Sequence, residues 1–309
     1  MDFTLYWFMF PVSMLVATTA MLSGIGGAAL FMPIFLLIFP LLGPEYPLTS
    51  PVAAIAVALL TETFGFSSGF VGYYMKRLID FGLSKTFLVI SVPAAITGAL
   101  LSHMVEPTWI RFAYGALVII LAYILLRGHE VPVEEMYDED MFIDDEGHTG
   151  SELNKEIDRR IMTGERQTTG RDGTVYKYNL YHCRKFPTVF GGFLTGMLSV
   201  GIGEVVMPQL VKDGKVPVPV AAATSILAVI ITVFAASFAH IASLMNEGGV
   251  NAVPWHLVAY TVPGVIIGGQ IGPRLHGMVH SHTMEKVIGG LFAVIGIAML
   301  WTVYKDLMI

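Results

Sequence analysis

The chain has few charged residues. Asp, Glu, Lys and Arg make up only 14% of its 309 residues, whereas 54% are hydrophobic and the mean hydropathy is +0.67. A soluble domain has about 25% charged residues, so this composition excludes an ordinary soluble protein and predicts a lipid environment. The apolar residues form long runs instead of short alternating segments, which favours membrane helices over a membrane β-barrel.

Cysteine and basic clusters are also scarce. Cys183 is the single cysteine, so no disulfide can form within the chain. No stretch is basic enough to predict nucleic acid as a partner. Residues 1–3 lack the positive charge that begins a signal peptide, so we expect the first apolar run to belong to the mature protein. The negative charge is local, because residues 128–150 hold nine acids and no Lys or Arg.

Motifs of enzymes and metal sites are absent. The sequence has no His-Glu-x-x-His, no Gly-x-Ser-x-Gly and no pair of aspartates within its apolar segments. We therefore expect no enzyme and no cofactor. His276, His280 and His282 lie close together, but three loop histidines without nearby acids or cysteines are more typical of a solvated loop than of a metal site. No metal is predicted.

The chain divides into a first membrane repeat, 1–127, a polar insert, 128–185, and a second membrane repeat, 186–309. Val92-Pro93 before Gly98 recurs as Val262-Pro263 before Gly268, which indicates an internal repeat. Five apolar segments are expected in each repeat, at about 3–22, 28–42, 50–73, 82–104 and 109–127, and at about 187–200, 203–211, 217–244, 254–276 and 284–305.

A glycine break separates the first two segments of each repeat. The first break runs from Ser23 through Gly24, Ile25, Gly26 and Gly27, and the second runs from Ser199 through Gly201, Ile202 and Gly203 to Glu204. Residues 187–211 are too few to cross the hydrocarbon twice at about 20 residues per crossing, so they are expected to form a re-entrant hairpin. The first two segments, 3–42, are longer and could form either a hairpin with long arms or two near-complete spans. A returning pair plus three spans predicts two inverted repeats in an all-α polytopic membrane protein.

The charged residues predict an orientation. With the insert in the cytoplasm, eight Lys and Arg residues of the membrane repeats lie at the inner face and only Arg111 and Lys305 at the outer face. This distribution follows the positive-inside rule and places both termini outside. Within the insert, residues 151–162 favour a short helix, and Asp172-Gly173 favours a β-hairpin over 167–180.

The two breaks together predict an anion site. Each break frees backbone N–H groups at a new helix N-terminus, which favours anions, and re-entrant hairpins from opposite faces meet near the midplane. No Lys or Arg lies at that depth, so backbone N–H groups and short hydroxyls would hold the anion. The alternative for the glycines is close helix packing. The candidate hydroxyls are those of Thr18, Thr19, Ser23, Thr195, Ser199, Thr224 and Ser225.

Two acids lie inside apolar segments, Glu62 and Glu204. An intramembrane carboxylate is costly and is typical of a proton or ion pathway. Glu204 lies in the second break, where a nearby anion would favour its protonated form, so both acids are candidates for coupling substrate movement to proton movement. The alternative is that Glu204 caps a helix N-terminus.

The two breaks with Pro33 and Pro208, together with Ala223-Thr224-Ser225, resemble the TauE/SafE family of membrane anion exporters. The resemblance covers both membrane repeats and implies export of sulfite, sulfoacetate or a related organosulfonate across a bacterial inner membrane. Two departures stand out, since Glu204 replaces a small residue and the insert is longer than the family's usual central loop.

Other functions stay open at this point. An anion channel would use the same site without saturation or coupling, and a membrane scaffold or signalling protein would act through the 128–185 insert. An intramembrane enzyme is disfavoured by the missing motifs. The sequence leaves the anion, the coupling ion and a homodimer undecided.

Overall fold

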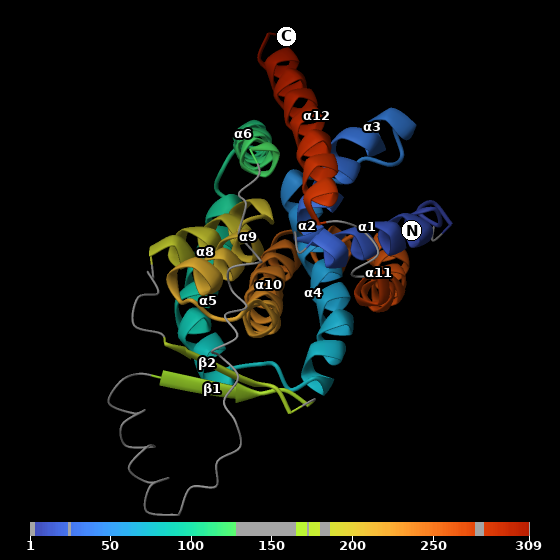
Figure 1. Ribbon diagram of the computed structural model, residues 1–309. Coiled ribbons are helices and arrows are strands. Elements are labelled where there is room, and N and C mark those ends of the chain that lie inside the picture. Colours follow the sequence, from blue (N-terminus) through green and yellow to red (C-terminus); the bar gives the residue numbers. More distant parts are fainter. Residues whose placement is uncertain are drawn as a thin grey trace, which may run out of the picture.

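In a computed structural model, the chain is a bundle of helices with a small β-hairpin at one end (Figure 1). The structure describes residues 4–23, 26–127, 165–171, 173–179, 186–275 and 281–308. The first repeat contains α1 (Met9–Ser23), α2 (Gly27–Pro33), η1 (Ile34–Ile38), α3 (Phe39–Leu42), α4 (Pro51–Met75), α5 (Phe81–Ser102) and α6 (Pro107–Leu126). The second contains α8 (Phe186–Leu198), α9 (Ile202–Pro208), η4 (Gln209–Asp213), α10 (Val218–Gly248), η5 (Val250–Ala252), α11 (Trp255–Leu275) and α12 (Ser281–Met308).

The all-α membrane class predicted from the sequence is confirmed. Within the described residues, five helices are long and apolar enough to cross a membrane, namely α4, α5, α6, α10 and Lys286–Met308 of α12. Six full spans were expected. The sixth, α11, has 21 residues but is not among the five, because its glycines, prolines and Gln270 make it less apolar. In each repeat a glycine break separates a first arm, α1 or α8, from a second arm, α2 or α9. The first arms α1 and α8 are shorter than a membrane span.

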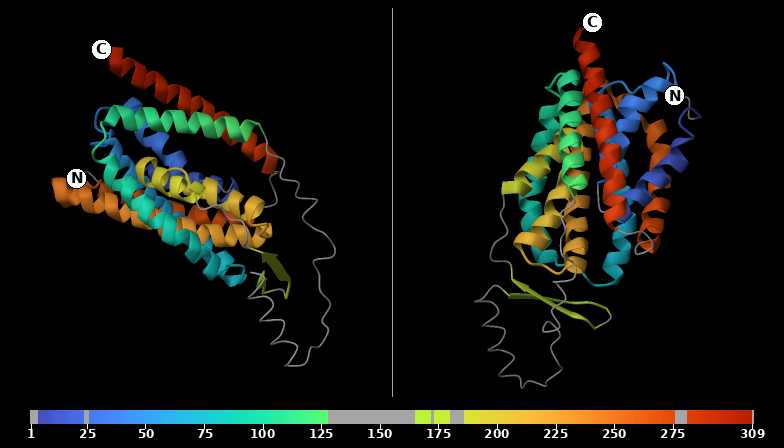
Figure 2. Two further views of the ribbon diagram at one scale, coloured as in Figure 1. Left: turned by 90° about the vertical axis from the view of Figure 1, so that its left-hand side faces the viewer. Right: turned by 45° about the horizontal axis from the view of Figure 1, so that its top comes forward.

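The helix contacts follow the same pattern in both repeats: each of the main contacts has a counterpart between the equivalent helices of the other repeat. The contact of α1 with α11 has its counterpart in the contact of α8 with α5, and α4 with α11 corresponds to α10 with α5. The helices α4 and α10 contact each other, as do α6 and α12, which lie side by side in both views of Figure 2. Two related halves would produce this pattern; their inverted orientation stays a prediction.

Glycines allow two of these helix pairs to approach closely. A Cβ at Gly98 or Gly196 would collide with the backbone of Phe193 or Ala95, so α5 and α8 touch through backbone atoms. A Cβ at Gly268 would collide in the same way with Met14 of α1. Small residues are the usual means of close packing between membrane helices. The match of Gly98 with Gly268 seen in the sequence therefore corresponds to equivalent packing positions.

Each short second arm changes its hydrogen-bond register at its proline. In the first repeat α2 ends at Pro33 and continues as the π-helix η1, and in the second α9 ends at Pro208 and continues as the π-helix η4. Proline has no N–H group and displaces the carbonyl four residues before it, which favours a local switch to the wider π geometry. The sequence predicted the breaks but not these π segments.

A β-hairpin lies at one end of the bundle, and both chain termini lie at the other (Figure 2). Its strands are β1 (Glu165–Thr169) and β2 (Val175–Asn179), which pair antiparallel with Thr169 opposite Val175. The hairpin predicted over 167–180 is thus confirmed. The acidic part of the insert and the helix expected at 151–162 lie outside the described residues.

Asp80 holds the β-hairpin against the bundle. Its carboxylate accepts hydrogen bonds from Arg166 of β1 at 3.0 and 3.1 Å and from the Tyr178 hydroxyl of β2 at 2.8 Å. The same carboxylate caps α5 by accepting from the Leu83 N–H at 2.8 Å. The Asp80 N–H donates to Thr224 of α10 at 3.1 Å. One residue therefore joins the β-hairpin, α5 and α10.

We expect the β-hairpin to detach at alkaline pH. Burial is the main cause that raises the pKa of Tyr178 above its ordinary value of 10.0; the hydrogen bond to Asp80 also raises it, and that with Thr168 lowers it. A detached hairpin would have the ordinary pKa. The docking free energy should therefore be constant below pH 10.0 and fall as the pH rises above it.

Electron paramagnetic resonance distances between spin labels at Gln167 and Lys85, followed from about pH 8 to 11, would measure this detachment. Tyr178→Phe is the control, because it removes the ionisation and should make docking weaker but independent of pH in this range. An unchanged label distance in the wild type up to the end of the range would contradict the prediction.

Candidate substrate site at the two helix breaks

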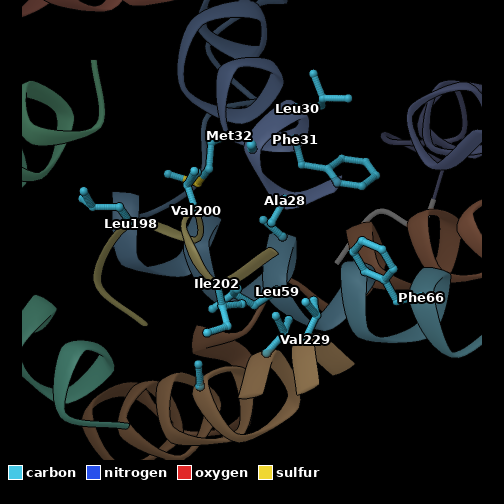
Figure 3. Close-up of a cluster of buried hydrophobic side chains, with 14 of the residues drawn as sticks. Ala28, Leu30, Phe31, Met32, Leu59, Phe66, Leu198, Val200, Ile202 and Val229 are labelled. Carbon is cyan, nitrogen blue, oxygen red and sulfur yellow. The ribbon is translucent and has the colours of Figure 1, made fainter. Parts of the chain in front are cut away.

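The two glycine breaks lie next to each other inside the bundle. The first lies between Ser23, the last residue of α1, and Gly27, the first of α2; the second lies between Leu198 of α8 and Ile202 of α9. Figure 3 shows apolar side chains of both breaks in one cluster with α4 and α10; those that it labels include Ala28, Met32, Leu59, Val200, Ile202 and Val229.

Glu204 bridges the two breaks. Its Oε1 accepts a hydrogen bond from the Gly26 N–H at 3.1 Å, and its Oε2 accepts one from the Gly201 N–H at 3.0 Å. The second bond is the carboxylate half of a capping box, since Glu204 is the third residue of α9. The alternative of a helix cap is thus observed. The carboxylate also reaches across to the other repeat, which a simple cap would not do.

Glu62 lies against the same break. It is buried near the middle of α4, and the backbone N–H groups of Gly27 and Ala28 hydrogen-bond its carboxylate. A Cβ on Gly26 would lie 2.9 Å from the Glu62 Oε1 and 3.3 Å from the Glu204 Oε1. The two carboxylates therefore face each other across a residue that has no side chain. Two like charges placed near each other in a low-dielectric interior repel each other.

Ser199 has two unusual properties in the second break. It is a non-glycine residue with a positive φ of 62°, a conformation that costs free energy and tends to occur at functional sites. Its hydroxyl is buried and has no hydrogen-bond partner among the described residues. A buried polar group without a partner is costly, so a ligand that supplied a hydrogen bond would be favoured here.

Four other predicted hydroxyls have hydrogen-bond partners within the described residues. Thr195 accepts from the Ile202 N–H at 2.7 Å and donates to the Gly191 carbonyl, so it closes the second break. Thr224 accepts from Asp80 near the β-hairpin, and Ser225 donates to Ala222 of its own helix at 3.0 Å. Thr18 donates to Met14 of its own helix at 2.8 Å. Their role in substrate binding stays a prediction.

The predicted glycines differ in how much space surrounds them. Gly201 has a φ of 140°, which only glycine adopts readily, and Gly26 has no room for a side chain. Gly203 has room, because a Cβ there would meet only Val229 at 3.8 Å. Gly24 and Ile25 lie outside the described residues, as does the side chain of Ser23.

Basic residues gather at the face with the β-hairpin and not at the breaks. A cavity of about 540 Å³ lies there, lined by Lys76, Leu78, Arg171, Tyr176 and Pro219. Within the described chain no ion pair involves Lys76 or Arg171. Pro219 lies in the first turn of the same helix α10 whose Val229 faces the second break. Two cations therefore line the cavity at this face.

The described residues contain no cluster of His, Cys, Asp and Glu that could hold a metal ion. His276 and His280 lie outside them, as does the side chain of His282. Sequence reasoning gave no role to His103 and His240, which contact each other in the structure. No sequence signal could have paired them, because they are 137 residues apart.

Comparison with known proteins agrees with a membrane transporter. The family model described as "Sulfite exporter TauE/SafE" matches residues 9–299. A curated relative, "Probable membrane transporter protein YunE" of Bacillus subtilis (strain 168), is 21% identical over 292 residues, which cover 94% of this chain and 95% of the relative. No solved structure matches the chain.

Proposed function

Since the chain belongs to the TauE/SafE sulfite exporter family and is a membrane transporter, we propose that it exports a small anion, most simply sulfite, sulfoacetate or a related organosulfonate. We place it in a bacterial inner membrane with the insert in the cytoplasm and both termini outside. One observation supports the proposal most strongly: the backbone N–H groups of two helix breaks hold carboxylate oxygens at the middle of the bundle.

The bound carboxylates support an anion as the ligand of the breaks. Gly26 and Gly201 donate to oxygen atoms of Glu204, as they would to the oxygens of a sulfonate or sulfite. An incoming anion must therefore displace Glu204 from these N–H groups. A protonated carboxyl accepts hydrogen bonds less strongly than a carboxylate, so a proton on Glu204 favours the exchange.

This competition couples the anion to a proton. Anion binding should take up a proton, and affinity should increase as the pH falls. Calorimetric titration of the purified protein with a sulfonate in buffers of different ionisation enthalpy would count the protons taken up; a sulfonate is suitable because its own charge is constant across neutral pH. Sulfate and acetate serve as comparison anions. Binding without proton uptake would be compatible with anion transport but would contradict proton coupling through Glu204.

Flux through proteoliposomes separates a carrier from a channel. Alternating access around the two breaks predicts anion flux that saturates with concentration. Flux that rises linearly with anion concentration and is independent of the proton gradient would favour a channel instead.

Ser199→Ala is expected to weaken anion binding without weakening the fold. The hydroxyl has no partner in the described structure, so its removal breaks no hydrogen bond among those residues. If it donates to the anion, its loss should cost about 1.5 to 3 kcal/mol, or roughly 10- to 100-fold in Kd. Ser102→Ala is the matched control, because the Ser102 hydroxyl donates to the Ala99 carbonyl of its own helix and lies outside the two breaks. Equal anion affinities of the two variants would remove Ser199 from the site.

A further inference from the structure

Three ionisable side chains form a connected chain between the surface and the interior. Glu247 near the end of α10 contacts His103 Nδ1 at 3.1 Å, and His103 Nε2 contacts His240 Nδ1 at 3.4 Å. His240 Nε2 in turn contacts the Gly196 carbonyl of α8 at 2.7 Å. We call Glu247, His103 and His240 the histidine path.

Exposure decreases along the histidine path. The side chain of Glu247 is 63% exposed, that of His103 is 10% exposed, and His240 is fully buried. The path starts at the face opposite the β-hairpin, because α5 begins beside Asp80 and its 22 residues extend about 33 Å to His103. Within the described residues, the ring nitrogens of His240 contact His103 of α5 and the Gly196 carbonyl of α8, so His103 is the titratable side chain that they meet.

We infer that the histidine path takes up a proton from the face opposite the β-hairpin and holds it on His240 when that face is acidic. Burial of His240 and the neighbouring His103 disfavour a charged imidazole, so the proton leaves again when the pH of that face rises. A proton leaves the Glu247 carboxyl and binds His103 Nδ1; His103 then releases the proton on its Nε2 to His240 Nδ1. The O–H bond of Glu247 and the N–H bond at His103 Nε2 break, and N–H bonds form at His103 Nδ1 and His240 Nδ1. His103 ends neutral, His240 ends as an imidazolium, and Glu247 is reprotonated from solvent.

The stored proton lies beside the first arm of the second break. The imidazolium would keep its Nε2–H bonded to Gly196, which lies in the last turn of α8. Carbonyl groups at a helix C-terminus favour a positive charge, and the effect is confined to the last turn. Gly196 precedes Ser199 by three residues, so the charge state of His240 acts on the arm that positions Ser199. His240 is thus a positioning residue that links the pH of one face to the substrate site.

This inference rests on the proposed function, because it supplies protons to a transporter whose site responds to pH. The central test uses His240→Gln, whose side chain amide can still donate to Gly196 but cannot hold a proton. In proteoliposomes, transport should respond to pH on the face opposite the β-hairpin in the wild type. In His240→Gln that response should shrink from about tenfold to less than about twofold. His256→Gln is the matched control, since His256 packs on Tyr6 and not on this path.

A second measurement needs no anion. Infrared difference spectra of the purified protein between high and low pH should show imidazolium bands from the titrating histidines, and these bands should be weaker in His240→Gln than in the wild type. His103→Gln should weaken them as well, and it also serves if His240→Gln does not fold. An unchanged band, or an unchanged pH response of transport, would overturn the histidine path. Suppose instead that the imidazolium bands change in the variants as expected but anion affinity is independent of pH. That result would contradict the proposed coupling at Glu204 and not the histidine path.

Discussion

Replacing Gly26 with alanine is expected to reduce transport by about tenfold or more while the protein still folds. The backbone of Gly26 has a φ of −56° and a ψ of 126°, which alanine adopts without strain, so the effect is steric. The new Cβ would lie 2.9 Å from the Glu62 Oε1 and 3.3 Å from the Glu204 Oε1. The carboxylates would have to move, and their hydrogen bonds to the break would lengthen. One such bond to a charged group contributes about 1.5 to 3 kcal/mol, or roughly 10- to 100-fold.

Gly203→Ala is the matched control for Gly26→Ala. Both residues lie in glycine breaks, but a Cβ on Gly203 would meet only Val229 at an ordinary contact distance of 3.8 Å. Transport by Gly203→Ala should therefore stay within about twofold of the wild type, because no group has to move. Rates are compared in proteoliposomes at equal amounts of folded protein, which size-exclusion chromatography in detergent would establish. Equal losses in both variants would mean that packing between helices, and not the carboxylates at Gly26, explains the effect.

Glu204→Gln is expected to remove the pH dependence of transport and to lower its rate. A glutamine has one oxygen that accepts hydrogen bonds, so it can keep the bond from Gly26 or the bond from Gly201 but not both. The variant also cannot exchange a proton. We therefore expect the ratio of transport rates at low and high pH to approach about one, and the maximal rate to fall by about tenfold.

The measurement for Glu204→Gln is anion uptake at a series of pH values with the membrane potential held at zero. Glu106→Gln is the control, since Glu106 precedes α6 at the surface and its side chain makes no capping hydrogen bond. A pH profile in Glu204→Gln that matches the wild type would exclude Glu204 as the coupling residue. Glu62 would then be the next carboxyl to test, because it contacts the same break.

The structure changes the interpretation of Glu204. From the sequence, Glu204 is either a coupling residue or a helix cap. In the structure it caps α9 through one oxygen and reaches Gly26 of the other repeat through the other. The substrate position proposed between the breaks is therefore occupied by a side chain of the protein. With the substrate bound at this position, as proposed, transport would include the displacement of that side chain, which the sequence did not indicate.

The two histidines show a second limit of sequence reasoning. His103 and His240 each lie near the end of an apolar segment, where a histidine is ordinarily solvated, so neither received a role. The structure buries His240 completely and brings His103 to it. Burial of a polar side chain deep in α10 depends on which helices surround it, and hydropathy along one segment does not contain that information.

The sequence by itself determined the membrane class, the positions of the long helices and the two glycine breaks. Each of these depends on local properties, because the transfer of a segment into lipid depends on its own side chains and a break depends on its own glycines and proline. Tertiary structure alone decided that Glu204 joins the breaks, that Glu62 faces it across Gly26, and that Thr224 accepts a hydrogen bond from Asp80. These contacts link residues more than 100 positions apart, so they depend on how the helices pack and not on any one segment.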